Sequence, residues 1–117
     1  MARTLLIVDD HAEFRASARA LLEAEGYDVI GEAADGEAAL ALVRRLRPEV
    51  VLLDIALPGL DGFAVAERLA RIEPPPAVVL VSSRERSAYG GRLDDAPVRG
   101  FLAKRQLSGS ALAVLVG

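Results

Sequence analysis

The chain has 117 residues, of which 52% are hydrophobic and none is cysteine, and its formal net charge at pH 7 is −3. This length suits a single domain spanning residues 1–117, and no apolar run approaches the roughly 18 residues that a membrane-spanning helix needs. The lack of cysteine excludes a disulfide framework and a thiolate metal site and fits a cytoplasmic protein, while the acidic balance argues against direct nucleic-acid binding by this domain.

The N-terminus leads directly into a strand pattern, so no signal or transit peptide is predicted. The continuous apolar run Thr4–Val8 is typical of a strand buried on both faces, and it ends at Asp9 and Asp10. A helix is predicted over residues 12–25, because apolar residues recur along one face and Gly26 follows in the position that commonly ends a helix.

The next strand and helix are shorter. Residues 28 to about 33 form a strand that contains Gly31, which favours a place at the edge of the sheet. Asp35 opens a helix that Pro48 ends. Basic side chains crowd the last turn of this helix, where complementing the helix dipole explains them better than an anion-binding patch does: Arg44, Arg45 and Arg47.

The most apolar run, Val50–Leu53, predicts a central strand that ends at Asp54. Residues 57–62 are rich in turn formers, and a helix is predicted from there over residues 63–72. Three consecutive prolines at positions 74–76 then make a stiff connection.

In the last third of the chain, strand patterns and helix patterns alternate less regularly. Residues 77–81 predict a fourth strand that ends at Ser82, and residues 100 to about 103 predict a fifth that ends at Lys104. Residues 84–99 contain neighbouring glycines, a proline and little helical periodicity, so only a short or irregular helix is predicted there.

A final amphipathic helix is predicted over residues 108–116, with Ser108 as its capping residue. Strands that alternate with helices through short connections form a parallel sheet with right-handed crossovers. The fold class is therefore α/β, a doubly wound (flavodoxin-like) five-stranded parallel sheet of strand order 2-1-3-4-5 with helices on both faces.

Polar side chains stand at the ends of four predicted strands: Asp9, Asp10, Asp54, Ser82 and Lys104. In a parallel sheet these ends share one edge, and strands 1 and 3 flank the switch point at which such folds bind ligands. Each residue alone has a structural explanation, such as helix capping or turn formation. The set is better explained by chemistry, because it combines three acids, a hydroxyl and the single lysine among 14 basic residues.

Three crowded carboxylates need a cation, and oxygen ligands suit Mg²⁺, which commonly binds one or two carboxylates together with phosphate oxygens. Asp54, at the end of the central strand, is the natural carboxylate nucleophile for phosphoryl transfer, which leaves Asp9 and Asp10 for the metal. His11 follows the acidic pair, but a histidine in a first helical turn is more often exposed and incidental, and Mg²⁺ favours oxygen.

Several short motifs together resemble the receiver domain of response regulators over essentially the whole chain. They are Asp9-Asp10, Leu53-Asp54 followed by residues 58–62, Val81-Ser82-Ser83, and Gly100-Phe101-Leu102-Ala103-Lys104. The amino-acid sequence at residues 35–40, 82–83 and 100–104 is similar to that of the subgroup that usually carries a C-terminal DNA-binding helix-turn-helix. The resemblance implies a switch in two-component signalling rather than a multiple-turnover enzyme.

The resemblance further implies that Asp54 accepts a phosphoryl group from the phosphohistidine of a sensor histidine kinase or phosphotransfer protein, or from a small donor. It implies that Mg²⁺ is bound by Asp10, Asp54 and the backbone carbonyl of Ala56, with Asp9 acting mostly through water.

The family pattern also implies that Ser82 and Lys104 contact the phosphoryl oxygens and that Phe101 is a switch residue, packed differently in the activated state. A homodimer would use the face formed by the fourth and fifth helices and the fifth strand. The chain departs from the family at Arg105, where many members have proline, so the geometry of that loop stays open.

Two other functions stay open at this point. A pseudo-receiver would act as a phosphorylation-independent protein-interaction module, which the weak fourth helix favours and the complete set of acids, hydroxyl and lysine opposes. A Mg²⁺-dependent hydrolase with a carboxylate nucleophile would need a cap or substrate pocket, for which 117 residues leave no visible segment.

Overall fold

The apolar runs of the sequence form a central sheet in the structure, a computed structural model that describes residues 2–117. The strands are β1 (Thr4–Val8), β2 (Asp28–Ala33), β3 (Val50–Asp54), β4 (Ala77–Ser82) and β5 (Gly100–Ala103). The helices are α1 (Ala12–Ala24), α2 (Gly36–Leu46), α3 (Gly62–Leu69), α4 (Arg92–Asp95) and α5 (Gly109–Val116), with the 3₁₀ turns η1 (Arg86–Ala88) and η2 (Lys104–Gln106).

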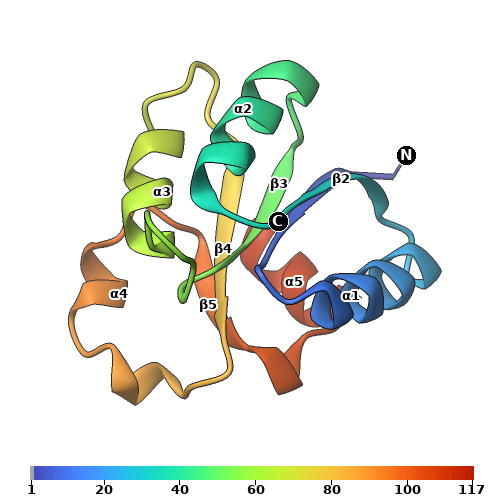
Figure 1. The fold of residues 1–117 in the computed structure, drawn as a ribbon. Coiled ribbons are helices and arrows are strands. Elements are labelled where there is room, and N and C mark those ends of the chain that lie inside the picture. Colours follow the sequence, from blue (N-terminus) through green and yellow to red (C-terminus); the bar gives the residue numbers. More distant parts are fainter. Residues whose placement is uncertain (1) are drawn as a thin grey trace.

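All neighbouring strands run parallel, in the order β2-β1-β3-β4-β5 (Figure 1). This confirms the predicted doubly wound α/β fold. The chain winds outward from β1 to β2 and then returns to β3 on the other side of β1. The carboxyl ends of β1 and β3 therefore lie side by side, at the place where open parallel sheets form a crevice for ligands.

Each face of the sheet carries its own core, because successive strand side chains point to opposite sides. Leu6 and Val8 of β1 belong to the cluster that α2, α3 and α4 cover. Leu5 and Ile7 belong to the cluster that α1 and α5 cover. Helices on both faces explain why the strands read as continuous apolar runs rather than as alternating ones.

Two helices end earlier than predicted. α1 ends at Ala24, and Gly26 follows with a left-handed φ of 98°. α3 ends at Leu69 rather than at residue 72, because the amides of Arg71 and Ile72 bond to carbonyls three residues back, at 3.2 and 3.1 Å. Such bonds tighten a last helical turn, and the proline at position 74 disfavours helical backbone in the residue before it.

The weak pattern over residues 84–99 corresponds to an irregular segment, as predicted: it holds η1 and the four-residue helix α4. The edge position expected from Gly31 is also confirmed for β2. A Cβ at Gly31 would lie 3.1 Å from a methyl group of Leu46, so the glycine lets α2 pack closely. Within residues 2–117, none of the helices has the length and apolar character needed to span a membrane.

Candidate functional site

The carboxyl edge of the sheet gathers the acidic residues that the sequence singled out. Asp9 follows β1 and is tied to the neighbouring strand by its backbone amide, which donates to the carbonyl of Ala33 at 3.0 Å. Asp54 is the last residue of β3 and pairs in register with Val81 of β4. Asp9 is fully buried and Asp54 is 2% exposed, so both carboxylates are held below the surface by the backbone that carries them.

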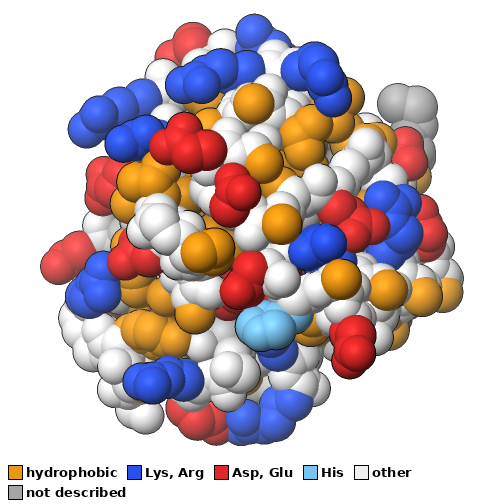
Figure 2. All heavy atoms as spheres, viewed as in Figure 1, with side chains coloured by type: hydrophobic (Ala, Val, Ile, Leu, Met, Phe, Trp, Pro, Cys, Tyr) orange, Lys and Arg blue, Asp and Glu red, His pale blue; other side chains and the backbone are white. Residues whose placement is uncertain are grey.

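Two further groups complete an acidic cluster with these two aspartates. One ligand atom from each of Asp9, Asp10, His11 and Asp54 lies within 4.8 Å of the others. The side chain of Asp10 is 34% exposed and that of His11 is 69% exposed, so the cluster opens to solvent on this side. Figure 2 shows the histidine in pale blue with acidic side chains beside it.

His11 is exposed, as predicted, but it is in direct contact with both neighbouring acids. Its Nδ1 lies 3.2 Å from Oδ1 of Asp9 and 3.1 Å from Oδ1 of Asp10. Its backbone amide also donates to Oδ1 of Asp9 at 2.8 Å, just before α1 begins. One oxygen of Asp9 is therefore committed to the start of the helix, and the other, Oδ2, points into the site.

Lys104 supplies the positive charge of the site. Its ammonium lies 2.5 Å from Oδ2 of Asp9 and 3.6 Å from Oδ2 of Asp54, and its side chain is only 17% exposed. The same ammonium lies 4.4 Å from the ring centroid of Phe14, on α1. A cation over an aromatic face is attracted to it, so Phe14 helps to hold the lysine in place.

The sequence does not predict the geometry of the loop after Lys104, because Arg105 stands where proline is common. In the structure the peptide bond between these two residues is trans, and among the described residues the cis bond lies at Glu73–Pro74. Lys104 itself begins the 3₁₀ turn η2, in which the side chain of Gln106 accepts a hydrogen bond from the amide of Ala103 at 3.2 Å.

The pKa of Asp54 is raised from an ordinary value of 3.8 to about 6, mainly by burial and also by the negative charge of Asp9. The ammonium of Lys104 and the amide of Ala56 oppose part of this rise. At pH 7 the carboxylate form of Asp54 therefore predominates, but in an environment that disfavours its charge. A phosphoryl group or a metal ion that brings compensating contacts would relieve this situation.

The donor set fits Mg²⁺, since three carboxylates converge with oxygen atoms available. Oδ2 of Asp9 is buried, and among the described residues its polar contact is the ammonium of Lys104 at 2.5 Å. Ala56 is in place next to the cluster: its amide donates to Oδ1 of Asp54 at 3.3 Å. The metal-binding role of the Ala56 carbonyl stays a prediction.

The turn after β3 is shaped around Asp54. The amide of Gly62 donates to the carbonyl of Ile55 at 2.8 Å, and a Cβ at position 62 would lie 2.5 Å from the backbone oxygen of Asp54. Asp61 caps α3, because its side chain accepts from the amide of Ala64 at 2.9 Å. The turn formers recognised in the sequence thus hold the start of α3 directly against the backbone of the residue that carries the central carboxylate.

Ser82 lies at the same edge but its hydroxyl is bonded elsewhere. It is 2% exposed, it accepts from the amide of Arg84 at 3.0 Å, and it forms a hydrogen bond with the hydroxyl of Tyr89. Phe101, half-buried on β5, makes an edge contact with the same tyrosine at 6.0 Å between ring centroids. The structure therefore joins two predicted residues through Tyr89, which the sequence did not single out.

Tyr89 and Phe14 were missed for different reasons. Tyr89 lies in the segment without periodicity, where no pattern marks an inward-facing residue. Phe14 is one of the apolar residues that recur along one face of the helix predicted over residues 12–25, and this pattern explains it as core. Its adjacency to the single lysine depends on the packing of α1 beside η2, and the sequence carries no signal for that contact.

Comparisons with known proteins agree with this geometry. The sequence family described as the response regulator receiver domain matches residues 5–114. Response regulator GacA of Pseudomonas aeruginosa is 39% identical over 101 residues, covering 86% of this chain and 47% of that protein. The virulence-factor transcription regulator BvgA of Bordetella pertussis is 35% identical over 121 residues, covering 100% of this chain and 58% of that protein. The chain thus spans about half the length of these relatives.

Solved structures give the same result. The signal receiver domain of NarL from Mycobacterium tuberculosis superposes with a TM-score of 0.85 at 34% identity, covering 99% of this chain and 98% of that one. A two-component response regulator of the LuxR family from Aurantimonas superposes with a TM-score of 0.87 at 27% identity, covering 100% of this chain and 87% of that one.

Proposed function

This chain belongs to the response regulator receiver domain family, and we propose that it is a phospho-accepting switch in which Asp54 takes up the phosphoryl group. The observation that supports this most directly is the placement of Asp54. It is buried at the end of the central strand, clustered with two other aspartates, and within 3.6 Å of the only lysine ammonium.

The proposed transfer is a displacement at phosphorus. An oxygen of the Asp54 carboxylate attacks the phosphorus of a phosphohistidine, and the bond from phosphorus to the histidine nitrogen breaks. The nitrogen keeps the electron pair and takes up a proton, and Asp54 becomes an acyl phosphate. A carboxyl group with a pKa of about 6 is largely ionised at neutral pH, so no general base is needed to deprotonate it.

The residues around Asp54 would neutralise the charge that the phosphoryl group brings. Lys104 would turn from Asp9 towards a phosphoryl oxygen, which is supported by the position of its ammonium between the two carboxylates. Asp10, Asp54 and the carbonyl of Ala56 would hold Mg²⁺, with Asp9 acting through water. When bound, the ion would compensate the negative charge of the carboxylates and phosphoryl oxygens, which otherwise repel one another.

The proposed partners follow from this chemistry. A sensor histidine kinase or a phosphotransfer protein would supply the phosphohistidine. The transcription regulator BvgA and the response regulator GacA are about twice as long as this chain, so the whole of residues 1–117 is proposed to be the single receiver domain that controls an effector. A homodimer through α4, β5 and α5 remains the proposed output contact, although α4 contributes only four residues to that face.

The test is direct phosphorylation. The domain would be incubated with acetyl phosphate or phosphoramidate and Mg²⁺, and its intact mass would be measured beside Asp54→Ala and beside a sample containing EDTA. We expect one added phosphoryl group in the wild type with Mg²⁺ and none in the other two. A wild-type protein that never gains this mass would refute the proposed function and support a phosphorylation-independent interaction module.

A further inference from the structure

Tyr89 is the one inward-facing residue between the end of β4 and the start of α4. Every other residue from Ser83 to Gly91 is exposed, whereas Tyr89 is half-buried and packs against the core beneath α3. The glycines at positions 90 and 91 follow it directly, and Gly90 has a left-handed φ of 54°. The segment is therefore anchored to the rest of the domain chiefly through this ring.

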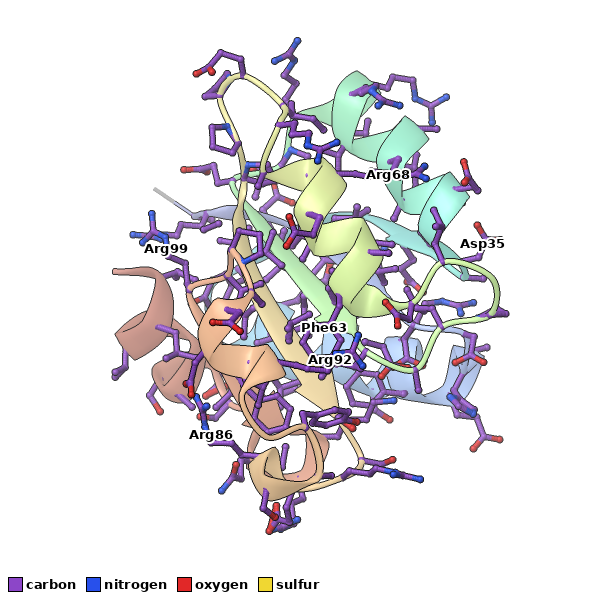
Figure 3. All side chains as sticks on the ribbon, turned by 90° about the vertical axis from the view of Figure 1, so that its left-hand side faces the viewer. Asp35, Phe63, Arg68, Arg86, Arg92 and Arg99 are labelled. Atoms are coloured by element: carbon purple, nitrogen blue, oxygen red, sulfur yellow. The ribbon has the colours of Figure 1, made fainter. Side chains whose placement is uncertain are left out.

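The ring of Tyr89 lies between two phenylalanines from different elements. Its centroid is 5.9 Å from that of Phe63 on α3 and 6.0 Å from that of Phe101 on β5, both in edge-to-face arrangements. The guanidinium of Arg92 also lies over Phe63, 4.0 Å from its ring centroid (Figure 3). We call Phe63, Tyr89 and Phe101 the aromatic cluster; aromatic pairs of this geometry attract one another beyond simple burial.

The hydroxyl of Tyr89 connects the aromatic cluster to the acidic site. Its hydrogen-bond partner in the structure is the hydroxyl of Ser82, at the edge that carries Asp54. A serine hydroxyl has one donor and two acceptor positions. The amide of Arg84 occupies one acceptor position of the Ser82 hydroxyl, and the hydroxyl of Tyr89 occupies a second position, as donor or as acceptor. The Ser82 hydroxyl is therefore bonded to residues that follow β4 and not to Asp54.

We propose that Tyr89 is a positioning residue that restrains the Ser82 hydroxyl in the unphosphorylated domain and transmits the release of that hydroxyl to the aromatic cluster. The inference rests on the proposed phosphorylation of Asp54. A phosphoryl group there offers acceptor oxygens to Ser82. When Ser82 turns towards them, Tyr89 loses its hydrogen-bond partner, and a half-buried hydroxyl without a partner is unfavourable.

The consequence is a shift between two arrangements of Tyr89. In one arrangement its hydroxyl is bonded to Ser82 and its ring lies between Phe63 and Phe101. In the other the hydroxyl reaches water, which requires the ring to leave its present place and frees space beside Phe101. Phosphorylation shifts the balance towards the second arrangement, because the phosphoryl oxygens compete with Tyr89 for Ser82 only while Tyr89 is bonded to Ser82. The signal would then pass from Asp54 to Phe101 and α4 through Tyr89.

The first experiment needs no phosphorylation. The chain has two tyrosines and no tryptophan, so Tyr27→Phe leaves Tyr89 as the only tyrosine. We expect Ser82→Ala, introduced into this background, to change the emission of Tyr89, because the hydroxyl loses its partner. Unchanged emission would show that the two hydroxyls are not bonded and would overturn the inference, whatever happens at Asp54.

The second experiment measures the rate at which acetyl phosphate and Mg²⁺ add a phosphoryl group, followed by intact mass. Tyr89→Phe keeps the ring and removes the restraint on Ser82, so we expect the rate to rise about two- to tenfold, the range that the loss of one neutral hydrogen bond allows. In the Ser82→Ala background the same substitution should have no effect. Tyr27→Phe is the matched control, since Tyr27 lies on the far side of the sheet from Tyr89 and should leave the rate unchanged.

The outcomes separate the two ideas. If no variant gains a phosphoryl group, the proposed function fails, and the emission experiment alone decides whether Tyr89 holds Ser82. If the wild type is modified but Tyr89→Phe reacts at the wild-type rate or more slowly, the restraint does not exist. If Tyr89→Phe accelerates the reaction equally with and without Ser82, Tyr89 acts by another route and the inference is wrong.

Discussion

Replacing Asp54 with asparagine should stabilise the metal-free domain at pH 8, although it removes the proposed functional group. The pKa of Asp54 is about 6 in the folded protein, against an ordinary value of 3.8. Each unit of difference between the two pKa values corresponds to about 1.4 kcal/mol of folding free energy. Ionised Asp54 therefore costs the folded state about 3 kcal/mol, and asparagine avoids this cost.

The sign of the pH dependence follows from the raised pKa. Below pH 3.8 the carboxyl is protonated in both the folded and the unfolded chain, so Asp54 costs nothing there. As the pH rises towards about 6 the unfolded chain ionises first, and the folded protein loses stability until its own carboxyl is ionised. The advantage of Asp54→Asn should thus be near zero at pH 3.5 and complete by pH 8.

The assay is urea unfolding at several pH values in the presence of EDTA. Asp28→Asn, which removes one charge from an exposed position at the start of β2, serves as the control and should give no comparable gain. At pH 8 the free energy of unfolding of Asp54→Asn should exceed that of the wild type by about 3 kcal/mol. A difference in stability that does not change with pH would refute the reasoning, because an amide can differ from a carboxyl in packing but only the carboxyl titrates.

Two further substitutions test the site. Lys104→Arg should change the melting temperature by no more than about 3 °C, roughly 1 kcal/mol for a domain of this size. It should weaken the response to phosphorylation, because a planar guanidinium does not fit the space of an ammonium that lies 2.5 Å from Asp9. The readout is the phosphorylation-dependent change in amide exchange over residues 84–103, and a change equal to that of the wild type would show that charge alone suffices. Gly62→Ala should destabilise the domain by about 2 kcal/mol, because its Cβ would lie 2.5 Å from the backbone oxygen of Asp54. Gly91→Ala is the control, with no atom within 4 Å of the added Cβ, and an equal loss in both variants would contradict the packing argument.

The pattern of the sequence was enough to predict the fold and to bring the main candidate residues together at one edge of the sheet. Continuous apolar runs alternating with helical patterns lead to a parallel sheet. The ends of parallel strands must share one edge, so Asp9 and Asp54 could be brought together without coordinates. The single lysine stood out by its identity in a chain that otherwise uses arginine, and it lies between these two carboxylates.

Only the tertiary structure decided how those groups behave. The raised pKa of Asp54 comes mainly from its burial, which no local sequence pattern measures. The partner of Ser82 was equally out of reach, because Tyr89 belongs to a segment without periodicity, and only the packing between Phe63 and Phe101 turns its ring inward. Periodicity records which face of an element meets the core, and contacts between irregular segments depend on how the finished elements pack around them.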